Sequence, residues 1–179
     1  MDEMQRRSDT ELLHEYASRG SETAFAEVVA RYTDLVYSAA LRQVGSPDLA
    51  RDVAQCVFTD LARKAPALAR KMGEQDLLVG WLYRGTRYAA LSLLRGERRR
   101  QAREREVMPQ FEPHPEPSRD WSRLRPVLDE AMASLSDQDR DALLLRYFKN
   151  QDFRTVGAAI GVSDDAAQKR VSRALERLR

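Results

Sequence analysis

Prolines gathered past the middle of the chain limit its fold more than any other feature. The stretch VMPQFEPHPEPSRD contains four of the seven prolines, namely Pro109, Pro113, Pro115 and Pro117. Proline has no amide hydrogen to donate and drives the residue before it away from helical backbone angles, so this stretch cannot form a helix. We expect an extended linker over residues 107–120, between a first domain at 1–106 and a second at 121–179.

Both parts beside the linker show the apolar spacing of amphipathic helices. In residues 21–45, apolar side chains recur three or four positions apart from Phe25 to Ala40, which predicts a helix buried along one side. A second helix is expected after Ser46, which can cap it, with Pro47 in its first turn. A third is expected from about Leu77 into an arginine-rich stretch. Since no segment alternates strongly as strands do, the predicted fold is all-α, with two small helical domains.

The second domain is expected to contain four helices. The last two are joined through IGVS, the arrangement of a helix-turn-helix, in which Gly157 permits close packing and Gly161 allows a left-handed turn. The expected helices span 121–135, a segment opened by a capping box of Ser136 and Asp139, about 153–160, and 164 to the end with Ser163 as its cap.

The last helix separates apolar from polar side chains when residues are spaced at about 100°. Its apolar side contains Ala167, Val171, Ala174, Leu175 and Leu178. Its opposite side contains Asp165, Lys169, Ser172, Arg173 and Glu176, with Gln168 and Arg170 at the edges. The polar side can donate hydrogen bonds to base edges and phosphates, although a solvated helix face has the same pattern.

The helix expected after Pro47 has a stripe of short polar side chains. Asp48, Asp52, Gln55 and Thr59 follow i, i+4, i+7 and i+11 spacing and share one side of the helix. The adjoining side contains the apolar residues Leu49, Val53, Cys56 and Val57. Such a stripe can dock onto a basic protein surface or simply face water.

The segment WLYRGTRYAALSLLRGERRR mixes aromatic residues with closely spaced arginines. Its aromatic residues are Trp81, Tyr83 and Tyr88. Aromatic rings stack on unpaired bases while arginines follow the phosphates, which is how single-stranded DNA is bound. In the alternative interpretation, Trp81 and Leu82 belong to the core and the arginines are only solvated.

Several classes of site have no support in the sequence. The charges nearly balance at +2, and Cys56 is the single cysteine. His14 and His114 are the two histidines, and no nucleophile–base pair, phosphate loop or metal-ligand spacing is present. The first residues lack an apolar signal core, and no apolar run approaches about 18 residues. We therefore expect a cytoplasmic protein without catalytic activity, cofactor, metal or membrane insertion.

Taken in order, these segments resemble bacterial RNA polymerase sigma factors, in particular the extracytoplasmic-function group of the sigma-70 family. Asp52, Gln55 and Phe58 match the Asp-x-x-Gln-x-x-Phe core of the family's region two. GWLYRGTRYAALSLLRGERRR is similar to the segment that melts and reads the minus-ten promoter element. The residues from Leu135 to Arg179 resemble region four, which reads the minus-thirty-five element through a helix-turn-helix.

The resemblance implies partners and residue roles. The partners are core RNA polymerase, through its β′ clamp helices and β flap, promoter DNA and an anti-sigma factor. The resemblance assigns polymerase docking to Asp48, Asp52, Gln55, Phe58 and Thr59. It assigns binding of minus-ten DNA to Arg84, Arg87, Tyr88, Ser92, Arg95, Arg98 and Arg99. It assigns binding of minus-thirty-five DNA to Gln168, Lys169, Arg170, Ser172 and Arg173.

Two departures from the family pattern leave the promoter sequence open. Tyr88 and Ser92 stand where the family commonly has Asn and Asp, and DDAAQ replaces a more usual Gly-Thr-Val run. Two other functions also remain open from the residues alone. A helix-turn-helix regulator acting without polymerase would need no docking stripe and would usually dimerise, and a helical adaptor would act through protein contacts.

Overall fold

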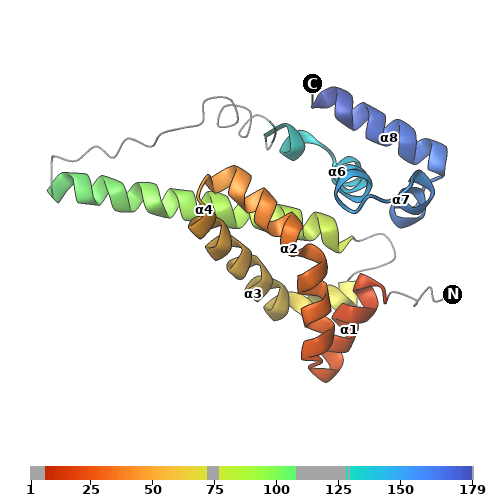
Figure 1. Cartoon of the computed structure of the whole chain (residues 1–179), viewed down its shortest axis with the longest axis horizontal. Coiled ribbons are helices and arrows are strands. Elements are labelled where there is room, and N and C mark those ends of the chain that lie inside the picture. The colour runs from red at the N-terminus through yellow and green to blue at the C-terminus, as the bar shows by residue number, and fades with distance from the viewer. Residues whose placement is uncertain (1–6, 72–76, 108–127, 129, 179) are drawn as a thin grey trace.

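Helices are the only regular elements in the part of the chain that the computed structural model describes, residues 7–71, 77–107, 128 and 130–178 (Figure 1). In chain order they are α1 (Asp9–Arg19), α2 (Glu22–Val44), α3 (Pro47–Lys71), α4 (Leu78–Val107), α6 (Asp137–Leu143), the π-helix η1 (Leu144–Phe148), α7 (Phe153–Ile160) and α8 (Asp164–Arg177). The all-α prediction is therefore confirmed.

Serine caps and glycine stops set the bounds of the first helices. Ser8 caps α1 in a reciprocal box with Glu11, and Ser21 caps α2 by accepting from the Ala24 amide at 3.3 Å. Gly20 and Gly45 end these helices in the left-handed region, at φ 66° and 72°. The side-chain oxygen of a serine satisfies an amide that has no partner inside the helix, which favours a start there.

The core of the N-terminal bundle lies where α1, α2, α3 and α4 meet. The apolar side predicted for residues 25–40 is buried along α2, with Phe25 at its edge. Tyr32 is buried in this core and donates its hydroxyl to Asp9. Burial and the Asp9 carboxylate beside it raise the pKa of Tyr32. Leu61 of α3 and Leu82 of α4 are fully buried here, and each such side chain contributes about 1.5–3 kcal/mol.

The C-terminal helices follow the predicted order with one difference. Ser136 Oγ accepts from the Asp139 amide at 3.2 Å and opens α6 as expected. The expected single helix then changes into η1, whose cap bond runs from the Lys149 amide to Leu144 O at 3.1 Å. A π-turn holds one more residue than an α-turn, so it shifts the face that the following residues present. Most of the helix expected at 121–135 lies outside the described residues, as does most of the linker.

The two groups of helices contact each other at α2 and at the N-terminal half of α4. Lys149 Nζ lies 3.6 Å from the centre of the Tyr32 ring and donates to Arg31 O at 3.2 Å. Burial at this contact lowers the pKa of Lys149. Gly80 faces Asp141 so closely that a Cβ atom there would lie 2.0 Å from Asp141 Oδ1. The C-terminal half of α4 projects beyond the bundle (Figure 1).

Candidate nucleic-acid and partner interface

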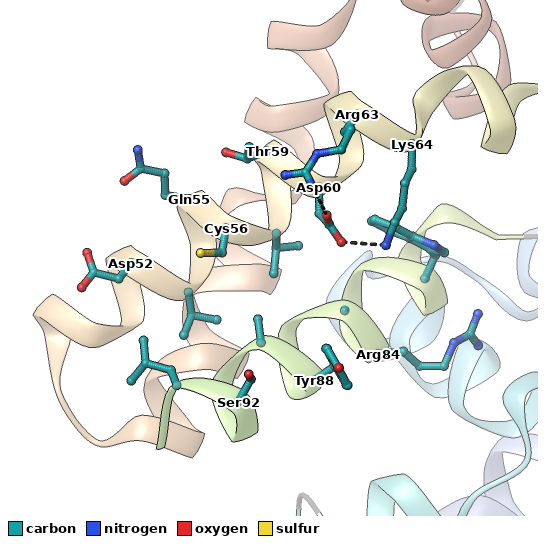
Figure 2. Close-up of a pocket in the computed structure, with 16 residues that line it drawn as sticks. Asp52, Gln55, Cys56, Thr59, Asp60, Arg63, Lys64, Arg84, Tyr88 and Ser92 are labelled. Carbon is teal, nitrogen blue, oxygen red and sulfur yellow. Dashed lines mark hydrogen bonds and ion pairs between the residues drawn. The ribbon is translucent and has the colours of Figure 1, made fainter. Parts of the chain in front are cut away.

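An open groove of about 920 Å³ lies between α3 and α4 (Figure 2). Its apolar floor contains Val53 and Val57 from α3 and Gly85, Ala89 and Leu93 from α4. Asp52, Gln55 and Thr59 project from α3, while Arg84, Tyr88 and Ser92 project from α4 (Figure 2). The helices thus bring residues predicted for polymerase docking and for minus-ten DNA to the walls of one groove.

The polar stripe on α3 is exposed over most of its length. Asp52, Gln55 and Thr59 are exposed and follow one ridge, while Asp48 pairs with Arg51 at 2.8 Å. Phe58 is half-buried and packs against the core, so it supports the helix from beneath. Cys56, assigned from its spacing to the apolar side, is exposed at the groove instead of joining the core.

A charged cluster that the sequence did not lead us to expect lies at one end of the groove. Asp60 pairs with Lys64 at 2.7 Å and with Arg63 at 3.7 Å (Figure 2). Lys64 Nζ also lies 5.8 Å from the centre of the Trp81 ring, across the groove on α4. The i, i+4 spacing of Asp60 and Lys64 was a usable signal for this pair, but the contact with Trp81 depends on tertiary packing.

The three aromatic residues expected to stack on DNA differ widely in exposure. Tyr88 is 72% exposed, whereas Tyr83 is 1% exposed and belongs to the core. Tyr83 is thus wrong as a candidate stacking residue. Trp81 is half-buried, and Leu82 is fully buried, so the alternative interpretation holds for Leu82 and in part for Trp81.

The arginines of α4 form an exposed basic ridge. Arg95 Nε donates to Leu91 O at 3.2 Å and Arg99 Nε donates to Arg95 O at 3.3 Å. Each bond holds a guanidinium along the helix while its terminal nitrogens face solvent. Arg98 is also exposed, and Arg87 is half-buried. Arg84 differs from them because it pairs with Asp137 of the C-terminal group at 3.1 Å.

The helix-turn-helix is confirmed in α7 and α8. Gly161 ends α7 at φ 71°, and a Cβ atom on Gly157 would lie 2.7 Å from Val162 O. Asp152 caps α7 by accepting from the Thr155 amide at 2.7 Å, and hydrogen bonds from Thr155 lower the pKa of Asp152. Val156 and Val171 fill the core between the two helices.

The outer side of α8 presents the residues predicted for the minus-thirty-five element. One shallow hollow is lined by Asp165, Gln168, Lys169, Ser172 and Arg173. Arg170 lies elsewhere, because it is half-buried and pairs with Asp139 of α6 at 2.9 Å. The structure therefore brings four of the five predicted residues together and engages Arg170 in the packing of α8 on α6.

Comparison with known proteins assigns the chain to a family. The family model described as Sigma-70, region 4 matches residues 126–178, which contain α6, η1, α7 and α8. ECF RNA polymerase sigma factor SigE of Mycolicibacterium smegmatis is 29% identical over 157 residues, which cover 86% of this chain. RNA polymerase sigma factor CarQ of Myxococcus xanthus is 30% identical over 163 residues, covering 89% of this chain and 90% of CarQ. The chain belongs to the extracytoplasmic-function group of the sigma-70 family.

The sigma factor aligns over most of its own length with relatives that differ in size. Probable RNA polymerase sigma factor RfaY of Xanthomonas campestris pv. campestris is 29% identical over 175 residues, or 93% of this chain. The chain spans 42% of the length of RfaY and 59% of the length of SigE. Among solved structures, that of CnrH in complex with the cytosolic domain of CnrY matches 95% of this chain at 20% identity, with a TM-score of 0.46.

The described part of this sigma factor contains neither a cluster of metal-binding side chains nor a helix that could span a membrane. Residues 7–71, 77–107, 128 and 130–178 contain no group of three or more His, Cys, Asp or Glu side chains placed to bind a metal ion. Within the same residues, no helix combines the length and apolar character that a membrane span requires.

Proposed function

We propose that this sigma factor is a transcription initiation factor that binds core RNA polymerase and directs it to specific promoters. The observation that carries the proposal is the groove between α3 and α4. Asp52 and Gln55 on one wall face outward for a protein partner, and Tyr88 and Ser92 on the other face outward for DNA. A factor that couples polymerase to an opened promoter needs both surfaces side by side.

The polymerase partner in this proposal is the pair of β′ clamp helices. Asp52, Gln55 and Thr59 form a straight polar ridge that fits along a partner helix carrying basic side chains. Phe58 packs beneath the ridge and keeps α3 in place on the bundle. Asp48 contributes at the rim, where its pair with Arg51 is largely exposed and is worth little in isolation.

The minus-ten element is bound along α4 in this proposal. Tyr88 supplies an exposed ring on which an unpaired base can stack, and base–aromatic stacking is worth about 1–3 kcal/mol. Ser92 lies close by on the same wall of the groove. Arg95, Arg98 and Arg99 continue along the helix and can follow the phosphates of the single strand.

The minus-thirty-five element is bound by α8 in the major groove. Gln168, Lys169, Ser172 and Arg173 reach base edges or phosphates from the exposed hollow. Arg170 instead holds α8 on α6 through Asp139.

The β flap of the polymerase is bound by η1 in this proposal. This helix offers an apolar surface with the exposed rings of Tyr147 and Phe148.

The division into domains at 1–106 and 121–179 with a linker at 107–120 belongs to the same proposal. A linker that tethers the two DNA-binding parts raises the effective concentration of the second contact after the first forms.

We also propose that an anti-sigma factor sequesters the protein. Because an initiation factor works where polymerase meets the chromosome, the protein acts in the cytoplasm and performs no catalysis of its own. The sigma-factor relatives do not favour a regulator that works without polymerase.

Reconstituted transcription tests the proposed function. Purified full chain is added to core polymerase with a library of promoters, and transcript start sites are mapped with and without it. We expect a defined set of starts that depends on the added protein and shares two spaced sequence elements. If no start depends on the protein, or if it binds duplex DNA and changes nothing with core polymerase, the proposed function is wrong.

A further inference from the structure

Asp165 places a negative charge in the hollow on α8, among side chains that can donate hydrogen bonds. The hollow is otherwise lined by Gln168, Lys169, Ser172 and Arg173, and all of its residues are exposed. DNA phosphates repel a carboxylate. A helix that carries Asp165 into the major groove therefore needs a different partner for it, and the candidates are donors on base edges.

The Asp165 carboxylate makes no capping hydrogen bond to the described residues of the helix. Ser163 Oγ accepts from the Ala166 amide at 3.3 Å, and Asp164 Oδ1 accepts from the Asp165 amide at 3.0 Å. Within the part of the chain that the structure describes, no hydrogen bond or ion pair engages the Asp165 carboxylate itself. It lies in the first turn of α8, and residues in the N-terminal part of such a helix contact base edges.

The chemistry of the major groove selects one base for this carboxylate. The donors there are the N4 amine of cytosine and the N6 amine of adenine. An ionised carboxylate only accepts, so at adenine its second oxygen would face N7, which is another acceptor. Cytosine offers its amine without that conflict. Lys169, one helical turn along the same side, can donate to O6 or N7 of the paired guanine.

We propose that Asp165 is a specificity-determining residue that selects a cytosine in the minus-thirty-five element. The inference rests on the proposed function, because it requires α8 to enter the major groove of promoter DNA. It adds a residue that the family resemblance did not assign, and it names the base that this residue recognises.

Selection from a randomised minus-thirty-five library tests the inference. Full chain bound to core polymerase is incubated with the library, and bound promoters are sequenced for the wild type, Asp165→Ala, Asp165→Asn and Asp164→Asn. We expect the wild type to enrich cytosine at one position, and Asp165→Ala to lower that enrichment about tenfold there alone. Asp165→Asn should move the preference to adenine, since an amide can accept from N6 and donate to N7. Asp164→Asn removes the same charge next to the hollow and should leave the preference unchanged.

The possible failures are distinguishable. If the wild-type holoenzyme selects a minus-thirty-five sequence whose base preferences are the same in Asp165→Ala, the Asp165 inference is overturned and the proposed function stands. Equal changes in Asp165→Asn and Asp164→Asn would assign the effect to general charge and also overturn it. A holoenzyme that selects no promoter sequence contradicts the proposed function, and the inference falls with it.

Discussion

At the scale of one residue, the side of the helix on which a side chain lies decides whether it is buried or exposed, as Tyr88 shows. Tyr83 and Tyr88 are five positions apart, which at about 100° per residue places them roughly 140° apart around α4. Tyr83 therefore packs into the core at 1% exposure, while Tyr88 faces the groove at 72%. Sequence proximity suggested one aromatic cluster, but the helical turn divides it.

The stacking role of Tyr88 can be measured directly. Tyr88→Ala should weaken binding of a single-stranded minus-ten oligonucleotide to the holoenzyme by about 1–3 kcal/mol, because it removes the exposed ring. Tyr88→Phe keeps the ring and should bind nearly as the wild type does. Fluorescence anisotropy with labelled oligonucleotide measures both affinities. Equal losses in the two variants would show that the hydroxyl acts and that stacking does not.

Helix boundaries were the most predictable feature at the scale of elements. The serines at 46, 136 and 163 and the glycine at 161 act at the predicted ends because their signals are local. The π-helix η1 and the pairing of Arg170 with Asp139 were not predictable, because both depend on packing between segments far apart in the chain. For the candidate site, the α3 stripe and the α8 face followed from helical spacing. The groove that joins α3 to α4 required the fold.

Two glycines in helices give a matched test of the helix-turn-helix packing. Gly157→Ala should lower the free energy of unfolding by about 1–3 kcal/mol, since its methyl group would press on Val162 O. Gly96→Ala meets no atom within 4 Å and should raise it by about 0.5–1 kcal/mol through helix propensity. Chemical denaturation followed by circular dichroism measures both. A Gly157→Ala protein as stable as Gly96→Ala would contradict the close packing at the turn.

The contact between the two groups of helices matters at the scale of the whole molecule. Asp137 holds Arg84, a residue predicted to bind minus-ten DNA, at 3.1 Å. Arg87 and Tyr88 line a hollow together with Asp137 and Arg140 across the same contact. In this arrangement the Asp137 carboxylate pairs with the guanidinium of Arg84, which a DNA phosphate would otherwise contact. Since the pair is exposed, it is worth only about 0.2–1 kcal/mol and opens readily.

Neutralising Asp137 should therefore favour DNA binding by the free protein. We expect Asp137→Asn to raise the affinity of the full chain for a minus-ten single strand by up to about fivefold. Asp164→Asn removes the same charge from the start of α8 and is the matched control, expected to have little effect. Both are measured by anisotropy at one salt concentration. A rise of equal size in the two variants, or a fall in Asp137→Asn, would show that Asp137 does not compete with DNA for Arg84.

The affinity of the full chain for core RNA polymerase tests the central claim most directly. Asp52→Arg reverses a charge on the α3 ridge, whereas Asp34→Arg makes the same change at an exposed position of α2 that does not line the groove. Circular dichroism confirms that both variants are folded, and titration of labelled protein with core enzyme gives each dissociation constant. We predict that Asp52→Arg weakens binding at least about tenfold, which is 1.4 kcal/mol or more, while Asp34→Arg binds as the wild type does. Wild-type affinity in Asp52→Arg would contradict docking of polymerase on α3.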